Sequence, residues 1–385
     1  FGILEFIRGS ILTVFLWNLV VYSFSNQLEF LSVTSIIGTY GLNLFCISLF
    51  TSPAIFILRD TKKDIAVFIF FLISVLIFYI YGSFYKDKFN IEVKKNLEYK
   101  IRVIGSNINL DRFYEDTEPV SIVQDLIKLS NPVTNEKTIF IWPEGALPEI
   151  LQEDFVIIRE AINNKFSENH LLIIGTNTKS EVDGKSNYFN SLSIYNNELK
   201  ILDSYDKINL VPFGEFLPFE NILKIIGLKS LTNNYQSFSA GNQRNIIEIK
   251  KQNFSLKILP LICYEIIYSG KLFNSPDFDL IINISEDGWF GDSIGPKQHF
   301  VHSIFRAIET GTYVLRSANN GIAAIINPLG EIENKVDFSQ TGYVDLTQRR
   351  QIQPTIFSKY GNNIFGLLIL LYIFLIFSFN KFRNE

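Results

Sequence analysis

The hydrophobic pattern changes character twice along the chain. No charged residue occurs from Phe30 to Leu58 or from Ile65 to Tyr85. If each stretch is helical, it is long enough to cross the hydrocarbon core of a membrane, which is about 30 Å thick. A shorter apolar run covers Ile364–Phe379, and Ser10–Phe24 is a fourth, which includes the polar Asn18. We therefore expect four membrane spans. The alternative of a buried core helix fits Ser10–Phe24 best.

Glycine and proline interrupt the longest of these apolar stretches. Gly38, Gly41 and Pro53 all fall between Phe30 and Leu58. A helix that contains such residues can kink or turn back within the membrane when neighbouring groups satisfy its backbone. We expect a kinked or partly re-entrant first long span.

Between the apolar runs, short β-type segments alternate with helical or polar ones. The predicted strands are Tyr99–Ile104, Thr138–Trp142, Leu171–Gly175, Phe189–Tyr195, Leu256–Ile262, Asp279–Ile284, Tyr313–Ser317, Ile322–Ile326 and Gly342–Leu346. The predicted helices are Val120–Leu129, Glu153–Asn164 and Gln298–Thr310, and Asn327–Gly330 is a hairpin-type turn. This alternation is typical of an α/β domain with layered sheets. The expected division is membrane helices over 1–85, a catalytic domain over 86–360, and a last span with its tail over 361–385.

Basic residues set the expected orientation. They flank the predicted spans at three places, which are Arg8, the cluster of Arg59, Lys62 and Lys63, and the pair Lys381 and Arg383. The Ser25–Glu29 loop has no basic residue. Basic residues concentrate on the cytoplasmic side of membrane proteins. With four crossings, residues 86–360 would then lie on the opposite side of the membrane.

Composition narrows the classes of function. The chain is 47% hydrophobic, with 36 Phe, which exceeds the needs of a soluble enzyme. Its net charge of −4 argues against a nucleic-acid partner. Because it starts at Phe1 and contains no Met, we expect it to lack its natural start. We see no cleavable signal peptide, and the three histidines do not form a convincing metal site, so we expect no metal and no cofactor.

Cys263 is the most informative single residue. It follows the apolar run Phe254–Ile262 and is followed at once by Tyr264 and Glu265. A buried strand that breaks into a polar turn can expose a nucleophile at the carboxyl end of a sheet. The alternative is a buried structural thiol. The other cysteine, Cys46, lies within a predicted span, so we expect Cys263 to be a free thiol.

Two further segments favour the chemical interpretation of Cys263. In IWPEGALP, Glu144 follows a short strand that Pro143 ends. In YDKINLVPFGEFLP, Lys207 precedes an apolar stretch and Glu215 lies among Pro, Gly and Phe. Ionisable groups lodged in such tight apolar loops are candidates for a functional site, although a single one would usually be solvated surface.

Together these groups provide the parts of thiol-based acyl transfer. A cysteine needs a base to become a thiolate, and the Glu144 carboxylate can serve. The tetrahedral intermediate needs positive charge or N–H donors near its oxygen, which Lys207 and the backbone N–H after Cys263 can supply. Glu215 can hold Lys207 charged and oriented. Tyr264 and Glu265 are further candidates because they adjoin Cys263, although Glu265 can instead be a charge at a helix N-terminus.

With these motifs in view, the chain resembles the carbon–nitrogen hydrolase (nitrilase) superfamily, whose triad is Glu, Lys and Cys in that order. Glu144, Lys207 and Cys263 match its three motifs. Within the superfamily the chain is most similar to the apolipoprotein N-acyltransferase family, in the GEFLP segment, the Cys-Tyr-Glu triplet, and the stretches Asn283–Gly291 and Arg316–Gly321. The resemblance covers about residues 97–346. The chain differs from the family pattern by two conservative changes. Gly145 stands where alanine is common in the family, and Glu286 stands where asparagine or a similar polar residue is common.

The resemblance implies a nitrilase-like α-β-β-α sandwich inserted between transmembrane helices. It implies an enzyme of the bacterial inner membrane, with a periplasmic catalytic domain. The enzyme would transfer a fatty acyl chain from a phospholipid donor to the N-terminal amine of a lipid-modified apolipoprotein, through a cysteine thioester. Glu144 would be the base, Lys207 the oxyanion-stabilising group and Cys263 the nucleophile. The alternatives are a membrane-tethered amidase that hydrolyses a C–N bond, and a transporter or scaffold with an inactive domain.

An apolar segment beside the predicted site has two interpretations. Hydrophobic residues crowd into the region from Phe213 to Phe238, including Phe216 and Phe219. This region can be a core helix, or an arm that leans on the membrane and admits acyl chains. Trp289 and Phe290 are similarly candidates for lipid contact, with core packing an equal alternative.

Overall fold

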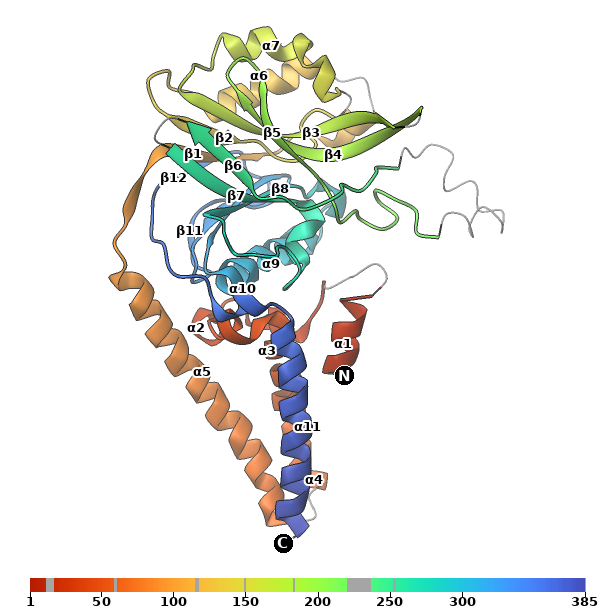
Figure 1. Ribbon diagram of the computed structural model, residues 1–385, viewed down its shortest axis with the longest axis vertical. Coiled ribbons are helices and arrows are strands. Elements are labelled where there is room, and N and C mark those ends of the chain that lie inside the picture. Colours follow the sequence, from red (N-terminus) through yellow and green to blue (C-terminus); the bar gives the residue numbers. More distant parts are fainter. Residues whose placement is uncertain are drawn as a thin grey trace.

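A layered α/β domain carries long helices that project from one of its ends (Figure 1). The computed structural model describes residues 1–11, 17–58, 61–114, 118–148, 150–182, 184–219, 237–251 and 254–384. The domain occupies the middle of the sequence, and the projecting helices come from both ends of the chain (Figure 1).

The strands join into one extensively paired system. Their order is β5-β4-β3-β2-β1-β9-β8-β7-β6, with β12 paired to β1, β10 to β9 and β11 to β10. The pairs β1–β2, β2–β3, β7–β8, β8–β9 and β1–β9 are parallel. The strands are β1 (Lys95–Ser106), β2 (Thr138–Ile141), β3 (His170–Val182), β4 (Lys185–Asn196), β5 (Ile201–Asp206), β6 (Ile247–Lys251), β7 (Phe254–Ile262), β8 (Leu280–Glu286), β9 (Tyr313–Asn319), β10 (Ala323–Ile326), β11 (Ile332–Val336) and β12 (Gly342–Arg349).

Three hydrophobic clusters define the layers. One lies between two sheet layers and includes Val103, Ile173, Ile258 and Ile282, together with Cys263. A second joins the outer face of β2 and β3 to α6 (Pro119–Ser130) and α7 (Val156–Asn163). A third joins the outer face of β7, β8 and β9 to α9 (Gly295–Thr310). The order is helix, sheet, sheet, helix, as the resemblance implied (Figure 1).

Every predicted strand coincides with an observed one, and the three predicted helices correspond to α6, α7 and α9. The Asn327–Gly330 turn also forms, because the Asn327 N–H donates to the Glu331 carbonyl at 2.9 Å. The strands β5, β6 and β11 were not predicted. Most side chains of β5 and β11 are exposed, so these strands lack the apolar pattern that marks the central ones.

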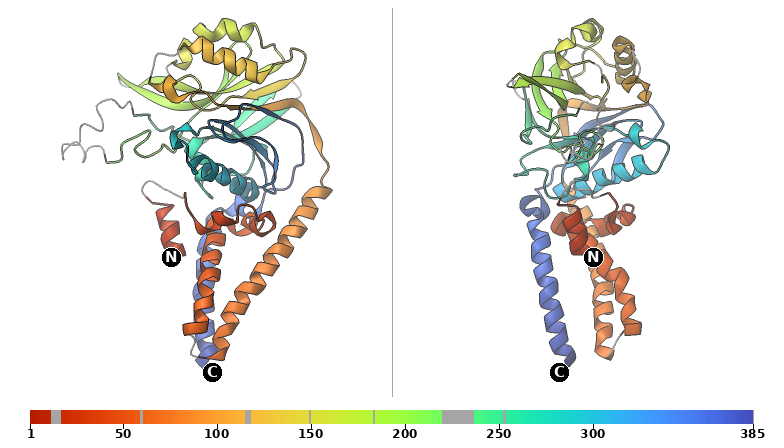
Figure 2. Two further views of the ribbon diagram at one scale, coloured as in Figure 1. Left: turned by 180° about the vertical axis from the view of Figure 1, so that it is seen from behind. Right: turned by 90° about the vertical axis from the view of Figure 1, so that its right-hand side faces the viewer.

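Two of the projecting segments are long and apolar enough to cross a membrane. One is Thr34–Leu58, made of α3 (Thr34–Thr51), η2 (Ser52–Ala54) and α4 (Ile55–Leu58). The other is Lys62–Ile91, made of η3 (Lys62–Asp64) and α5 (Ile65–Ile91). A shorter apolar stretch, Asn363–Ser378, lies in α11 (Asn363–Asn384). All three point away from the domain, and the C-terminus lies at their far end (Figure 2).

The span predicted over Ser10–Phe24 is wrong for the residues that the structure describes. The helix α1 (Gly2–Arg8) ends before it, and Val20–Phe24 is a short 3-10 helix, η1. Residues 12–16 lie outside the described part. The η1 segment packs on the protein: the Val21 N–H donates to the Asn43 side chain at 3.2 Å, and the Tyr22 ring contacts His302. Part of its apolar surface, including Val21, is therefore buried against the rest of the protein.

The expected position of Arg8 is corrected as well. Its neighbour Gly9 accepts a hydrogen bond from Tyr40 at 2.9 Å, and α1 lies beside the half of α3 that is nearer the domain (Figure 1). Lys62 and Lys63 instead begin α5 at the far end, where the C-terminus also lies. In the structure Arg8 therefore lies nearer the domain than these lysines do, so the three basic sites are not gathered at one end of the helices. Arg59, a member of the same predicted cluster, lies outside the described residues.

The base of the projecting helices is attached to the domain by close contacts. The predicted kink occurs at Gly38, whose φ is 70°, and a Cβ there would lie 2.1 Å from the Phe357 ring. Phe357 belongs to α10 (Ile356–Tyr360). On α5, a Cβ at Gly82 would lie 1.9 Å from the Glu29 carbonyl of α2 (Leu28–Leu31). Glycine is required at Gly82 because the two backbones approach so closely, and at Gly38 because of its positive φ and the Phe357 ring.

Candidate active site

Cys263 lies at a sharp turn at the end of β7. It is the first residue of the 3-10 helix η7 (Cys263–Ile267), and its φ of 47° is in the left-handed region. A non-glycine residue rarely adopts this conformation, which costs on the order of 1–3 kcal/mol and concentrates at functional sites. The strand-to-helix turn was predicted from the sequence. Both cysteines of the chain are free thiols, also as expected.

Lys207 follows β5 directly and is buried, with 1% of its surface exposed. Its ammonium group donates to Glu215 Oε1 at 2.8 Å and lies 3.4 Å from Glu144 Oε1. A buried ammonium group is stable only when paired. The two carboxylates provide this pairing, so the predicted partnership of Lys207 with Glu215 is present in the structure.

Glu144 occupies the loop after β2 and is 6% exposed. Its Oε1 accepts from the Asn190 amide at 2.7 Å, and its Oε2 accepts from the Glu286 backbone N–H at 2.9 Å. Gly175 on β3 makes room for this loop, since a Cβ there would lie 2.7 Å from the Glu144 Cα. The carboxylate is therefore held from two sides.

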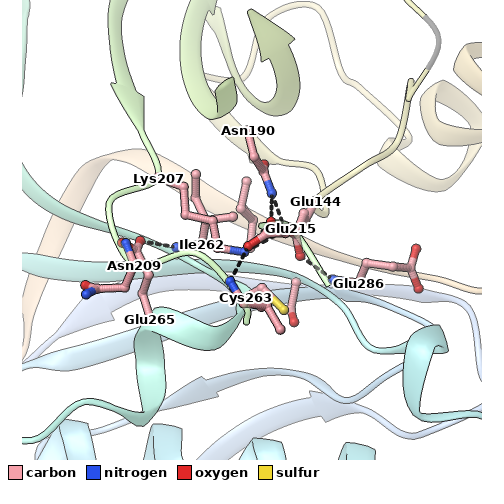
Figure 3. A network of polar contacts seen from close by, with 12 residues as sticks. Glu144, Asn190, Lys207, Asn209, Glu215, Ile262, Cys263, Glu265 and Glu286 are labelled. Atoms are coloured by element: carbon pink, nitrogen blue, oxygen red, sulfur yellow. Dashed lines mark hydrogen bonds and ion pairs between the residues drawn. The ribbon is translucent and has the colours of Figure 1, made fainter. Parts of the chain in front are cut away.

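The three predicted residues come together between the two sheets. Figure 3 shows Glu144, Lys207 and Glu215 in one network, with the Cys263 sulfur beside it. Burial, and after it the negative charge of Glu144, raises the pKa of the Cys263 thiol well above its usual range, while Lys207 acts in the opposite direction. The thiol is thus protonated near neutral pH and needs a base.

The charge of Lys207 is also set by its surroundings. Burial alone would lower the pKa of Lys207, but Glu215 and Glu144 outweigh it and hold this pKa well above its usual range. The site therefore keeps a permanent positive charge beside the Cys263 thiol. Such a charge can stabilise an oxyanion that forms on a substrate bound to the sulfur.

Glu265 connects the Lys207 loop with the Cys263 turn. Its Oε1 accepts from the backbone N–H groups of Ile208 and Asn209, both at 3.1 Å, and its Oε2 accepts from the Ile262 N–H at 3.0 Å. Arg244 donates to the same carboxylate at 2.6 Å. Glu265 thus holds the two loops in a fixed position relative to each other. The alternative interpretation, in which it is only a charge at a helix N-terminus, does not account for these contacts. Tyr264 is buried beside it.

Two parts of the network were not predicted from the sequence. Asn190 donates to both Glu144 and Glu215, at 2.7 and 2.9 Å. It lies within a predicted strand, with no turn signal to mark it. Arg112 pairs with Glu286 in a fully buried contact and also donates to the Gly145 carbonyl at 3.0 Å. The only signal for this pair was the unusual acidic residue at 286.

The predicted lipid-contact residues lie in different environments. Phe219 and Trp289 are 63% and 52% exposed, whereas Phe216 is half-buried. Trp289 packs against Phe113, with ring centroids 4.7 Å apart. Phe290 packs inward, 5.1 Å from Trp17. The rest of the predicted apolar arm, residues 220–236, lies outside the described part of the chain.

No metal site is evident in the described part of the chain, where no three His, Cys, Asp or Glu side chains gather as ligands. The carboxylates of Glu144 and Glu215 and the ammonium of Lys207 are already engaged by protein partners. The chemistry that the arrangement supports is a thiol, a carboxylate and a fixed cation acting on a carbonyl carbon.

Comparison with known proteins identifies the class. The family model of carbon–nitrogen hydrolases matches residues 131–354. An amidase from Nesterenkonia sp. AN1 aligns with 12% identity and a TM-score of 0.43, covering 66% of this chain and 92% of the amidase. The family match includes Glu144, Lys207 and Cys263. This chain belongs to the carbon–nitrogen hydrolase family.

The curated relatives narrow the family further. Apolipoprotein N-acyltransferase of Rickettsia typhi is 34% identical over 379 residues, which is 97% of this chain and 73% of the relative. That of Rhodopseudomonas palustris is 30% identical over 387 residues, 97% of this chain and 71% of the relative. That of Brucella suis is 30% identical over 355 residues, 90% of this chain but 65% of the relative. Within the carbon–nitrogen hydrolases, the chain is a member of the apolipoprotein N-acyltransferase family.

Proposed function

We propose that this protein moves a fatty acyl chain from a membrane phospholipid to the N-terminal α-amino group of a diacylglyceryl-cysteine apolipoprotein. This proposal rests on the observation that Glu144, Lys207 and Cys263 lie close together in a domain from which long apolar helices project. The names of the relatives support the lipoprotein acceptor.

The first half-reaction loads the acyl chain onto the protein. Glu144 takes the Cys263 thiol proton, and the sulfur attacks the ester carbonyl carbon of the phospholipid. The Lys207 ammonium and the Tyr264 backbone N–H stabilise the negative oxygen of the tetrahedral intermediate. When the intermediate collapses, the C–O bond breaks, Glu144 returns the proton to the lyso-lipid oxygen, and a thioester remains on Cys263.

The second half-reaction delivers the chain. The amine of the apolipoprotein attacks the thioester carbon, and Glu144 takes a proton from the amine nitrogen. The C–S bond breaks, an amide forms, and the proton returns to the Cys263 sulfur. Two half-reactions suit two bulky lipid substrates, because only one of them has to occupy the reacting position at a time.

The membrane location of the donor agrees with the projecting helices. Only 11% of the most apolar stretch of Lys62–Ile91 is buried by the rest of the chain. Lys62, Lys63 and Lys381 lie at the end far from the domain, and the positive-inside rule favours a cytoplasmic location for that end. We therefore place the domain, residues 86–360, on the periplasmic side of the inner membrane, between the helices of 1–85 and the span and tail of 361–385.

The deciding experiment separates loading from delivery. Purified full-length protein is incubated with a mixture of phosphatidylethanolamine and phosphatidylglycerol, and the Cys263 peptide is weighed by mass spectrometry. We expect one added acyl mass that hydroxylamine removes. We then expect a lipidated, free-amine lipoprotein peptide to gain that mass as an amide.

Controls decide between this function and its rival. Cys263→Ala should abolish the adduct, and Glu144→Gln should slow its formation strongly. Release of free fatty acid or ammonia without any acylated peptide would favour the amidase alternative. Acyl transfer that required both substrates before any adduct or lyso-lipid appeared would contradict the two-step mechanism.

A further inference from the structure

A buried histidine on α9 contacts the backbone of the nucleophile turn. His299 Nε2 lies 3.2 Å from the Cys263 carbonyl oxygen, and the side chain is completely buried. His299 lies outside the Glu144, Lys207 and Glu215 network, and the mechanism above gives it no role. Its contact is with the one peptide group that joins Cys263 to Tyr264.

The contact between His299 Nε2 and the Cys263 carbonyl is a hydrogen bond when Nε2 carries a proton, because a carbonyl oxygen can only accept. Arg316 Nη2 lies 3.1 Å from His299 Nδ1 and 2.8–2.9 Å from the Asp287 carboxylate oxygens, so one guanidinium N–H group can donate to both. Asp287 Oδ1 is itself 2.9 Å from Nδ1. Burial and the charge of Arg316 lower the pKa of His299 against the attraction of Asp287, which keeps the ring neutral. A neutral ring can donate from Nδ1 to Asp287, or it can accept at Nδ1 from Arg316 and donate from Nε2. Only the second form also satisfies the Cys263 carbonyl, which can only accept.

The ring is also fixed in direction. Trp17 stacks on it with a centroid distance of 5.4 Å, and Phe290 contacts it at 5.6 Å. At the other end of the turn, Arg306 of α9 donates to the Ile267 carbonyl at 3.0 Å. The helix α9 therefore holds both the first and the last carbonyl of η7.

The geometry of the peptide group links the contact of His299 with the Cys263 carbonyl to the direction of the Tyr264 N–H. In a planar trans peptide, the C=O and the following N–H point in opposite directions. The Cys263 carbonyl points to α9, on the outer side of its sheet, so the Tyr264 N–H points toward the opposite side. The Cys263 side chain belongs to the core between the two sheets, where Glu144 and Lys207 lie.

We propose that His299 is a positioning residue, which holds the Cys263–Tyr264 peptide group so that the Tyr264 N–H faces the developing oxyanion. The bond also stabilises the left-handed conformation of Cys263, which would otherwise relax by rotation of this peptide. The inference rests on the proposed role of Cys263 as the nucleophile.

The test compares two reactions of the same thiol in full-length protein. Acylation by phosphatidylethanolamine needs an oxyanion donor, whereas alkylation by iodoacetamide does not. For His299→Asn, whose amide is too short to reach the carbonyl, we expect acylation to slow by about 10²–10³, the usual cost of one lost oxyanion donor, mainly in kcat. We expect alkylation to stay near the parental rate. His299→Gln, whose amide nitrogen can reach the position of Nε2, should recover most of the acylation.

A matched control lies one turn further along the helix. His302 is also buried in α9, and neither of its ring nitrogens has a hydrogen-bond partner among the described residues. His302→Asn should therefore acylate at the parental rate when folded. If His299→Asn does not fold, His299→Leu takes its place, because it also has no donor for the carbonyl, and we expect the same slowing of acylation.

Three results would overturn the inference: parental acylation by His299→Asn, an equal loss of acylation and alkylation, or acylation by His299→Gln as slow as that expected for the Asn variant. Failure of the proposed function looks different. An acyl adduct that persists in Cys263→Ala would remove Cys263 as the nucleophile, whatever the His299 variants do.

Discussion

The predicted active site and the helix α5 present opposite combinations of charge and solvent exposure. In the site, ionisable groups are buried: Lys207 is 1% exposed and Glu144 6%. On α5, large apolar side chains are uncovered, and Leu76 is 63% exposed. Each arrangement is unfavourable in isolation and is stabilised by a partner. The buried charges have each other, whereas the exposed apolar groups need lipid.

This difference separates a buried cluster of charged groups from an uncovered apolar surface within one chain. The charge cluster is complete within the protein, so it is fixed before any substrate arrives. The apolar side chains of α5 are left uncovered by the rest of the chain, as is expected of a surface that packs against lipid. The predictions below remove one partner at a time, from the largest effect to the smallest.

The largest effect is expected when the ammonium group of Lys207 is replaced by a group of the same charge but a different shape. Lys207→Arg keeps the charge, but a planar guanidinium cannot place a compact ammonium between Glu144 and Glu215. We expect acyl transfer to fall by about 10²–10³, the usual cost of a lost oxyanion donor. Single-turnover measurement of the Cys263 thioester provides the check. Near-normal turnover would remove Lys207 from the catalytic role.

A second prediction leaves a buried carboxylate unpaired outside the triad. Arg112→Ala removes the partner of Glu286, and burial already raises the pKa of that glutamate. We expect unfolding in detergent to become easier by about 3–5 kcal/mol, as for other broken buried pairs. Lys137→Ala, which breaks an exposed pair with Glu98, is the control and should have no measurable effect. Equal stability of the two variants would contradict the importance of the Arg112 contact.

A third prediction places a charge on the surface expected to face lipid. Leu76→Lys on α5 should disfavour membrane insertion by about 2.5–3.5 kcal/mol, the translocon-scale cost of a charge at a helix centre. Val156 on α7 is the matched control, because it is 64% exposed, almost the same as Leu76. Val156→Lys should insert normally. Insertion is measured from the membrane-extracted fraction, and identical behaviour of the two variants would argue against lipid contact by α5.

The same contrast shows how far the sequence could predict this molecule. Central strands such as β7 and β8 are buried on both faces, so continuous apolar runs marked them clearly. Glu144 and Cys263 were recognisable because each follows such a run at a Pro-rich or polar turn. Lys207 was recognisable because it precedes an apolar stretch in a loop that contains Pro and Gly. The charged edge strands carried no equivalent pattern and were missed.

Other features depend on which segments meet in space. Arg112 reaches Glu286 because β1 pairs with β9 at Gly105 and Ser106, and β9 pairs in turn with β8, which ends at Glu286. The residues next to Arg112 and Glu286 in the sequence do not indicate that the two side chains are in contact. The Ser10–Phe24 prediction failed for the same reason, since part of its apolar surface, including Val21, is buried against the rest of the protein. An apolar run shows that a segment needs burial, but it does not show whether protein or lipid provides it.

The smallest effect concerns the pH dependence of the free thiol. The pKa of Cys263 is raised well above its usual range, first by burial and then by Glu144, so the thiol loses its proton only at high pH. Iodoacetamide alkylation without substrate should therefore rise by about tenfold per pH unit through neutrality, because the thiolate fraction does so below the pKa. Lys207 should not reverse the rise, since its pKa is also raised and it remains a cation. Unfolded protein, as the control, should instead level off near the ordinary cysteine pKa. A plateau below pH 7 in the folded protein would mean that the thiolate is already stabilised before substrate binds, and Glu144 would then have no proton to remove in the first step.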